Sequence, residues 1–110
     1  MTENRLSEVY LAIEDVIKTF SDTHIIGSTK EKRKVAFAPV QRKIEQLRFI
    51  ASSEAPYIWE GIHKLEEHYK AVFRITVTNG HTANQHLAWA ESAIRGIRRE
   101  LHSFENDKKQ

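Results

Sequence analysis

The sequence predicts an all-α protein that folds as an antiparallel four-helix bundle with up-down-up-down topology. Three observations support this fold class. Apolar residues recur at steps of three and four along four segments, which is the period of a helix with one buried face. The 110 residues include only four glycines and two prolines, so turns are few and the elements are long. The connections between the segments are short, which favours antiparallel neighbours.

Length and composition predict one globular domain. The chain is 40% apolar and 29% charged, and its size is typical of a single compact unit, which we place at residues 1–105 with a polar tail at 106–110 that frays. No apolar run approaches the roughly 20 residues of a membrane span, and the N-terminus lacks the pattern of a secretory signal. We therefore expect a cytoplasmic protein with no membrane partner.

The first helix is expected at about residues 4–23. Its buried stripe consists of Leu6, Val9, Tyr10, Ile13, Val16, Ile17 and Phe20. The acidic side chains of this segment lie mainly off the stripe. The sequence HIIGSTK then interrupts the pattern with Gly27 and Ser28, which indicates a loop.

The second helix is expected to start near Pro39 or to bend there, because proline is tolerated in a helix only in the first turn or at a kink. Its apolar seam consists of Phe37, Val40, Ile44, Leu47 and Ala51. The pattern leaves open whether residues 24–38 form a long loop or additional helix.

The third helix is expected to open at Ala55 and Pro56 with Ser53 as a candidate N-cap, and to end at the Asn79-Gly80 pair. Its seam consists of Ile58, Ile62, Leu65, Tyr69, Val72 and Thr76. The β-branched residues within 71–78 also alternate in a manner typical of a short strand. We predict helix there, and the strand remains the alternative.

The fourth helix has the most regular pattern in the chain. Thr82 is its expected N-cap. Its seam alternates steps of four and three without exception through Ala83, Leu87, Ala90, Ile94, Ile97, Leu101 and Phe104.

Trp89 breaks this pattern, because it lies roughly 115° from the centre of the seam at 100° per residue. Ala93 and Gly96 share its side of the helix, and a large ring beside small residues is typical of a protein interface. Leu11 and Phe49 also lie off their seams. We therefore predict a non-catalytic protein that acts by protein–protein interaction, as a homodimer or as an adaptor or regulatory subunit. The alternative is that single apolar side chains are exposed without function, or that a loop covers them.

A basic segment provides a second functional hypothesis. Residues 25–50 carry seven basic and two acidic side chains, although the whole chain has a formal net charge of only +2. The cationic residues around Pro39 are Lys30, Lys32, Arg33, Lys34, Arg42 and Lys43. Such a cluster neutralises phosphates without reading sequence, so nucleic-acid binding through residues 30–43 is the alternative function.

Arg95 and His102 are separated by six residues, which is similar to the Arg-x(4-6)-His spacing of the HEPN ribonucleases. The resemblance implies an all-helical metal-independent RNase in which the pair lies at a dimer interface. Arg95 would then stabilise phosphate charge and His102 would act as general acid or base. The chain departs from that pattern in two ways: Gly96 follows the arginine where the family usually has a polar residue, and Arg74 with His81 repeats the spacing.

A metal site is the remaining chemical hypothesis. Glu60 and His63 form a Glu-x-x-His pair with Glu67 one turn later, the type of motif that di-iron bundle proteins contribute from two helices. One copy is present, and the three residues lie roughly opposite the seam of their helix. We expect a solvated polar face rather than a metal site, and we expect no cofactor, because the chain has no cysteine and no glycine-rich phosphate loop.

Overall fold

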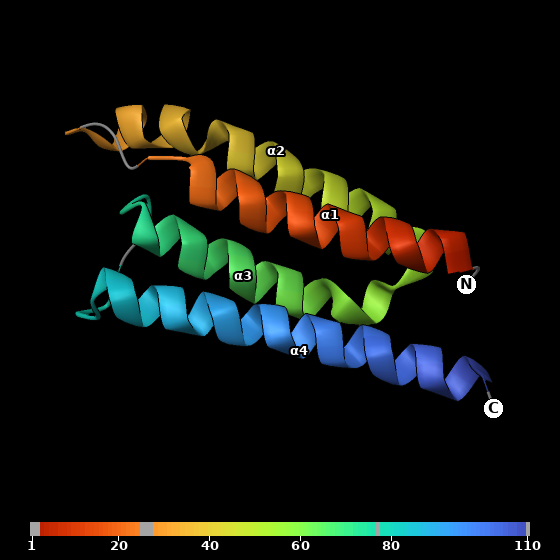
Figure 1. Ribbon diagram of the computed structural model, residues 1–110. Coiled ribbons are helices and arrows are strands. Elements are labelled where there is room, and N and C mark those ends of the chain that lie inside the picture. The colour runs from red at the N-terminus through yellow and green to blue at the C-terminus, as the bar shows by residue number, and fades with distance from the viewer. Residues whose placement is uncertain (1–2, 25–27, 77, 110) are drawn as a thin grey trace.

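The computed structural model describes residues 3–24, 28–76 and 78–109, and this part of the chain forms four α-helices and no strand (Figure 1). They are α1 (Glu3–Asp22), α2 (Lys30–Glu54), α3 (Trp59–Val72) and α4 (Ala83–Lys109), with a short 3₁₀ turn, η1 (Pro56–Ile58), before α3. Successive helices run in opposite directions. The predicted all-α fold and antiparallel four-helix bundle are confirmed.

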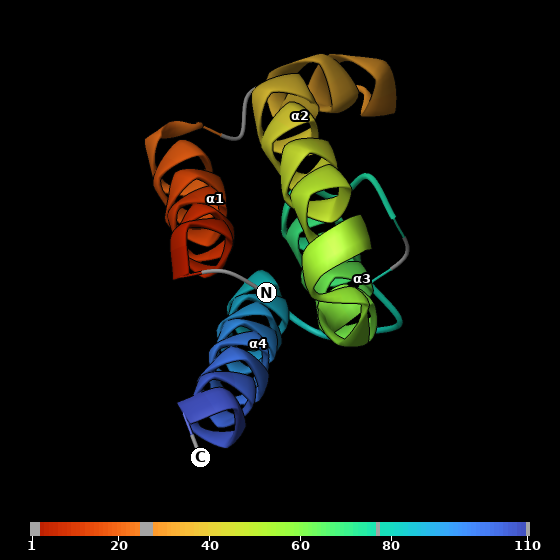
Figure 2. The same cartoon turned by 90° about the vertical axis from the view of Figure 1, so that its right-hand side faces the viewer.

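The bundle is built from two pairs of helices. α1 packs mainly on α2 and α3 mainly on α4, while α1 and α4 have the sparsest contact among the helix pairs that touch. Figure 2 looks along the helices and shows the α1–α2 pair on one side of the molecule and the α3–α4 pair on the other. An ion pair between Glu14 of α1 and Arg98 of α4 bridges the sparse side. Among the described helices, none combines the length and apolar character needed to cross a bilayer.

The core is filled by apolar side chains from all four helices, as the predicted seams require. The largest fully buried side chains are Val9, Ile13, Val16, Val40, Ile44, Leu47, Ile58, Ile62, Leu65, Phe73, Ile97 and Leu101. At one end, Phe20 of α1 stacks on Tyr69 of α3 with ring centroids 3.7 Å apart, and Phe37 of α2 meets Phe73 edge-on at 5.0 Å. These rings join three helices in one cluster.

α2 is longer than the loop interpretation of residues 24–38 allowed, because it already begins at Lys30. Thr29 caps it: the Thr29 hydroxyl accepts a hydrogen bond from the Lys32 backbone N–H at 3.2 Å. Pro39 lies inside this helix, and in Figure 2 the first turns of α2 lie at an angle to the rest. Proline removes one helical hydrogen bond and crowds the preceding turn, so the bend, rather than a new start, is the outcome at Pro39.

α3 is shorter at both ends than the sequence pattern predicted. Ser53 is not its N-cap, because that residue lies inside α2. α3 ends at Val72 instead of Asn79, since Arg74 takes the left-handed conformation with φ of 59° and the Ile75 N–H turns back to the Lys70 carbonyl at 2.9 Å. This is a Schellman-type helix end formed without glycine. The helix predicted across residues 71–78 therefore stops early, and the strand alternative also fails for the described residues of that stretch.

α4 begins as predicted and runs long. The Thr82 hydroxyl accepts a hydrogen bond from the Gln85 N–H at 3.1 Å, which confirms Thr82 as a cap. The helix continues to Lys109 and so includes residues 106–109 of the tail that we expected to fray.

α3 and α4 approach each other closely at Gly61. A Cβ atom placed on Gly61 would lie 2.6 Å from Cγ1 of Ile97, a side chain that is 1% exposed. By contrast, a Cβ placed on Gly96 would meet no atom of the described residues within 4 Å. The two glycines therefore have different roles: Gly61 permits the packing of α3 on α4, whereas the packing within one chain does not require Gly96.

This difference predicts opposite effects of two alanine substitutions. Gly61→Ala is expected to destabilise the protein by about 1–3 kcal/mol, because the new methyl group overpacks a filled interface. Gly96→Ala is expected to stabilise it by about 0.5–1 kcal/mol, because alanine is the better helix former. Urea unfolding in dilute solution measures both. Equal effects of the two substitutions would contradict the close approach at Gly61.

Candidate functional site

The outer side of the α3–α4 pair carries a hollow of about 440 Å³, which we call the α3–α4 groove. It includes three of the predicted interface residues, Trp89, Ala93 and Gly96, all contributed by α4. From α3 and the turn before it come Tyr57, Ile58, Glu60, Gly61, Lys64 and His68, and α4 adds Ser92, Ile97 and Glu100. The side of α4 that the sequence marked as a second surface is thus one wall of a groove.

Trp89 occupies one end of this groove, with 36% of its surface exposed. Its ring lies against three imidazoles: the centroid distances are 4.8 Å to His81, 5.3 Å to His86 and 5.4 Å to His68. His68 comes from α3, His86 from α4 and His81 from the connection between them. The sequence pattern did not predict this cluster. The three-residue spacing of His86 and Trp89 indicates that these two lie on one side of α4, whereas their contact with His68 depends on how α3 and α4 pair.

The protonation pattern of His86 follows from its partners. Its Nε2 lies 3.0 Å from the Thr78 carbonyl oxygen, which can only accept, so Nε2 carries the proton and donates it. Nδ1 of neutral His86 is then an acceptor and lies 3.1 Å from Nδ1 of His68, which must donate. His86 is buried, with 6% of its surface exposed, and this pair of hydrogen bonds satisfies both of its nitrogens.

His68 is half-buried and is shifted toward its neutral form. Burial, together with the adjacent His86, lowers the pKa of His68, and Glu67 opposes this effect in part. When both imidazoles are neutral, one proton lies between the two Nδ1 atoms.

The structure separates the remaining predicted interface residues from this groove. Leu11 lies on α1 and is 66% exposed, and Phe49 lies on α2 and is 79% exposed. Neither is part of the α3–α4 groove. The five predicted residues therefore belong to different faces of the bundle, and those that share one site are Trp89, Ala93 and Gly96.

The six cations of the basic segment lie along the first half of α2, on more than one side of it. Lys43 lies 3.9 Å from Asp15 of α1, whereas the Nε of Arg33 donates to the Arg74 carbonyl after α3. Lys34 and Arg42 line a hollow of about 370 Å³ together with Lys70 of α3, and its other lining residues are Phe37, Ala38, Gln41 and Ile75. We call this the α2–α3 hollow; it combines an apolar floor with a cationic rim.

Arg95 and His102 are both exposed on α4. Their positions differ by seven, which places them about two turns apart on one side of the helix. Neither residue lines the α3–α4 groove. An RNase activity carried by this pair stays a prediction.

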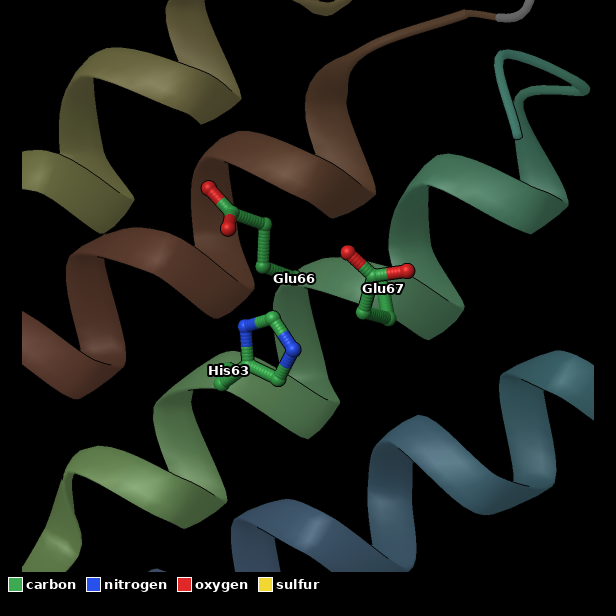
Figure 3. A group of neighbouring side chains, drawn as sticks. All are labelled: His63, Glu66 and Glu67. Atoms are coloured by element: carbon green, nitrogen blue, oxygen red, sulfur yellow. The ribbon is translucent and has the colours of Figure 1, made fainter.

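The acidic residues of α3 do not gather as the Glu60, His63 and Glu67 motif suggested. The ligand atoms that lie within 4.8 Å of one another belong to His63, Glu66 and Glu67 (Figure 3). Glu60 instead lies 3.4 Å from Lys64 one turn later. All three clustered side chains come from a single helix.

Glu66 of this cluster is already engaged by α2. It is 7% exposed and accepts hydrogen bonds from Gln41 at 2.7 Å and from Arg48 at 3.1 Å. Burial by itself would raise the pKa of Glu66, but the hydrogen bond from Gln41 and the charges of Lys70 and Arg48 outweigh it and hold the pKa below its ordinary value. Glu66 therefore joins α3 to α2 through a buried polar network, and ligation of a metal would compete with that network.

Comparison with known protein families, with curated proteins and with solved structures finds no match to this chain. Inference about function therefore rests on the geometry of these sites.

The network around Glu66 predicts a specific loss of stability in acid. Because the pKa of Glu66 is lower in the folded chain than its ordinary value of 4.5, the ionised group stabilises the fold above that pH and ceases to do so as pH falls through the folded pKa. Glu66→Gln is expected to cost about 1–3 kcal/mol at pH 7 and progressively less below pH 4.5. Thermal unfolding across pH 3–7 measures this difference.

Glu45→Gln is the matched control, because Glu45 contacts the same Arg48 from a half-exposed position. It is expected to have a small effect at every pH. A difference between wild type and Glu66→Gln that stays constant from pH 7 to pH 3 would contradict the assignment.

Proposed function

We propose that the protein acts by protein–protein interaction and that the α3–α4 groove is the surface through which it pairs with a second copy of itself. The observation that carries this proposal is the open space beside Gly96. A residue without a side chain lies next to Ala93 and the half-exposed Trp89 in a groove, and packing within the chain does not account for it. Small residues allow another helix backbone to approach, and tryptophan is a common interface anchor.

A two-fold pairing suits the shape of this surface. In a two-fold interface the same patch is used by both copies, and an axis perpendicular to α4 sets the two α4 helices antiparallel across each other. A crossing at Ala93 and Gly96 sets the small residues face to face. It also brings Trp89 of one copy toward the other end of the groove in its partner, where Tyr57 and Glu100 lie.

Charged side chains also line the groove. Lys64 and Glu60 form an ion pair within one chain at 3.4 Å, and Glu100 lies toward the Tyr57 end. Antiparallel pairing of two identical grooves turns Glu100 of each copy toward the Trp89 end of its partner, away from the partner's own Glu100. A role as adaptor or regulatory subunit would use the same surface with another protein.

The pairing is tested by two substitutions in the groove. Trp89→Asp places a charge in the interface, and Gly96→Leu extends a side chain into the space where an added Cβ meets no atom of the described residues within 4 Å. Each is expected to convert dimer to monomer at tens of micromolar, which is a loss of at least about tenfold in affinity or about 1.4 kcal/mol. Light scattering coupled to gel filtration measures the mass, and circular dichroism checks that the helices persist.

Phe49→Asp serves as the control, because Phe49 is more exposed than Trp89 but lies outside the groove. It is expected to leave the dimer intact. A wild-type chain that is monomeric under these conditions would refute the self-association, and a dimer that both groove variants retain would place the interface elsewhere.

Nucleic-acid binding is the second candidate function, and the α2–α3 hollow is the observation that favours it. Lys34, Arg42 and Lys70 surround an apolar floor, so phosphates can meet the rim while a base lies on the floor. Lys30 and Lys32 extend the positive surface toward the start of α2, and both are exposed.

Salt dependence distinguishes this second function from a merely solvated surface. If the basic segment grips phosphates, the logarithm of the affinity for single-stranded RNA falls with the logarithm of salt concentration by about 0.7 per phosphate neutralised. The variant Lys32→Gln with Lys34→Gln and Arg42→Gln is expected to flatten this slope by roughly two units. Fluorescence anisotropy at several salt concentrations measures the slope.

Arg95→Gln with Arg99→Gln controls for total charge, because these exposed arginines lie on α4. If this control flattens the slope as much as the α2 variant, binding depends on net charge and the hollow has no part in it. Absence of measurable binding at low salt would eliminate the second function.

A further inference from the structure

We propose that His68 and His86 form a binding site for one divalent late transition metal ion, of the class of Cu²⁺ or Zn²⁺, at the Trp89 end of the α3–α4 groove. Imidazole nitrogen is a preferred ligand of these ions, and affinity within the first transition row is greatest for Cu²⁺. The two residues are 18 positions apart and belong to different helices, so no local sequence motif predicts the pair. Both ligands belong to one chain, so the site does not depend on the proposed dimer.

The first argument is the separation of the ligand atoms. The Nδ1 atoms of His68 and His86 lie 3.1 Å apart. With metal–nitrogen bonds of about 2.0–2.1 Å, this separation corresponds to an angle at the metal of about 100°. That value lies between the roughly 90° of a tetragonal Cu²⁺ site and the roughly 109° of a tetrahedral Zn²⁺ site. The spacing of the two helices therefore already suits two neighbouring ligands of one ion.

The second argument is the hydrogen bond behind His86. A histidine that ligates a metal usually donates its other ring N–H to a carboxylate or a backbone carbonyl, which fixes the tautomer and aims the free nitrogen. His86 donates Nε2–H to the Thr78 carbonyl at 3.0 Å, so its Nδ1 presents a lone pair toward His68. Burial of His86 keeps this orientation rigid.

The ion would replace the proton that lies between the two Nδ1 atoms. In the metal-free protein His68 holds its proton on Nδ1 and shares it with His86. On binding, His68 would adopt its other neutral tautomer with the proton on Nε2, and each ring would turn so that its Nδ1 lone pair leaves the Nδ1–Nδ1 line and faces the ion. No net proton is released by the neutral pair. Because His68 and Trp89 line the open groove, water can reach the ion and complete its coordination.

The charged side chains near the histidine pair do not oppose the binding of a cation. Glu67 lies next to His68 on α3 and interacts with it electrostatically. Lys64 lines the groove, but its ammonium group lies 3.4 Å from Glu60. The competing cluster of His63, Glu66 and Glu67 is less suitable, because Glu66 is held by Arg48 and Gln41 and would have to leave both.

Trp89 provides a direct measurement of occupancy. The chain has two tryptophans, so Trp59→Phe leaves Trp89 as the single indole, with its ring centroid 5.4 Å from His68 and 5.3 Å from His86. Paramagnetic Cu²⁺ quenches the fluorescence of an adjacent indole. Titration with Cu²⁺ alone is expected to give saturable quenching at one ion per chain, and calorimetry with Zn²⁺ is expected to give the same stoichiometry.

The decisive variant is His68→Gln, made in the same single-tryptophan background. Glutamine keeps a side-chain amide that can donate a hydrogen bond at position 68, while the site loses one imidazole. Affinity for both ions is expected to fall by at least the roughly 10- to 100-fold that removal of even a second-shell partner costs. His63→Ala, which removes the exposed histidine of the competing cluster, is expected to leave affinity and quenching unchanged.

Three results would overturn the proposal: no saturable quenching and no heat with either ion, equal affinity in wild type and His68→Gln, or loss of binding in His63→Ala. The first would mean that the histidine pair holds a proton and nothing else. Because the histidine pair lies at one end of the proposed interface, the titrations are made both on wild type and on Gly96→Leu, so failure of the metal site is distinguished from failure of the interface.

Discussion

The close approach of α3 and α4 at Gly61 is the constraint on which the candidate sites depend. Because Ile97 packs where a side chain at position 61 would lie, the two helices run side by side at short distance. This places His68 within hydrogen-bond distance of His86 and sets Tyr57 and Lys64 across the groove from Ala93 and Gly96. A bulkier residue at position 61 would separate the helices and alter the groove and the histidine pair together.

The position of Trp89 is explained by its neighbours. It lies off the apolar seam of α4 because it packs on a cluster of imidazoles at the α3–α4 connection rather than in the bundle core. One of its flanks remains exposed in the groove. The same side chain thus belongs to a polar aromatic cluster and to an open surface, which is a combination that suits both an interface anchor and a reporter of the histidines beneath it.

The two helix pairs of the bundle carry different chemistry. The α3–α4 pair has the groove and the histidine cluster. α2, which belongs to the other pair, has the basic segment and supplies Gln41 and Arg48, which hydrogen-bond to Glu66 of α3. The core cluster of Phe20, Tyr69 and Phe73 joins the pairs at one end. Substitutions in the α3–α4 groove are therefore expected to leave the α2–α3 junction intact, whereas the groove and the histidine pair share His68 and Trp89 and respond together.

The sequence by itself determined most of the apolar core. Periodicity identifies a helix's apolar face without reference to its neighbours, so the four helices and their bundle were predictable, and the capping preference of threonine predicted Thr82. Periodicity did not predict that Ala83 is exposed or that Glu66 and His86 are buried. Periodicity predicted the start of α2 and the end of α3 poorly. Thr29 caps the start of α2 and the left-handed Arg74 terminates α3, and apolar spacing does not encode this local geometry. What only the tertiary structure decided is which residues of different helices meet. Helix pairing places Leu11 and Phe49 on faces away from Trp89. The close approach at Gly61 brings His68 to His86, because residues 18 apart in sequence have no local interaction that could fix their distance.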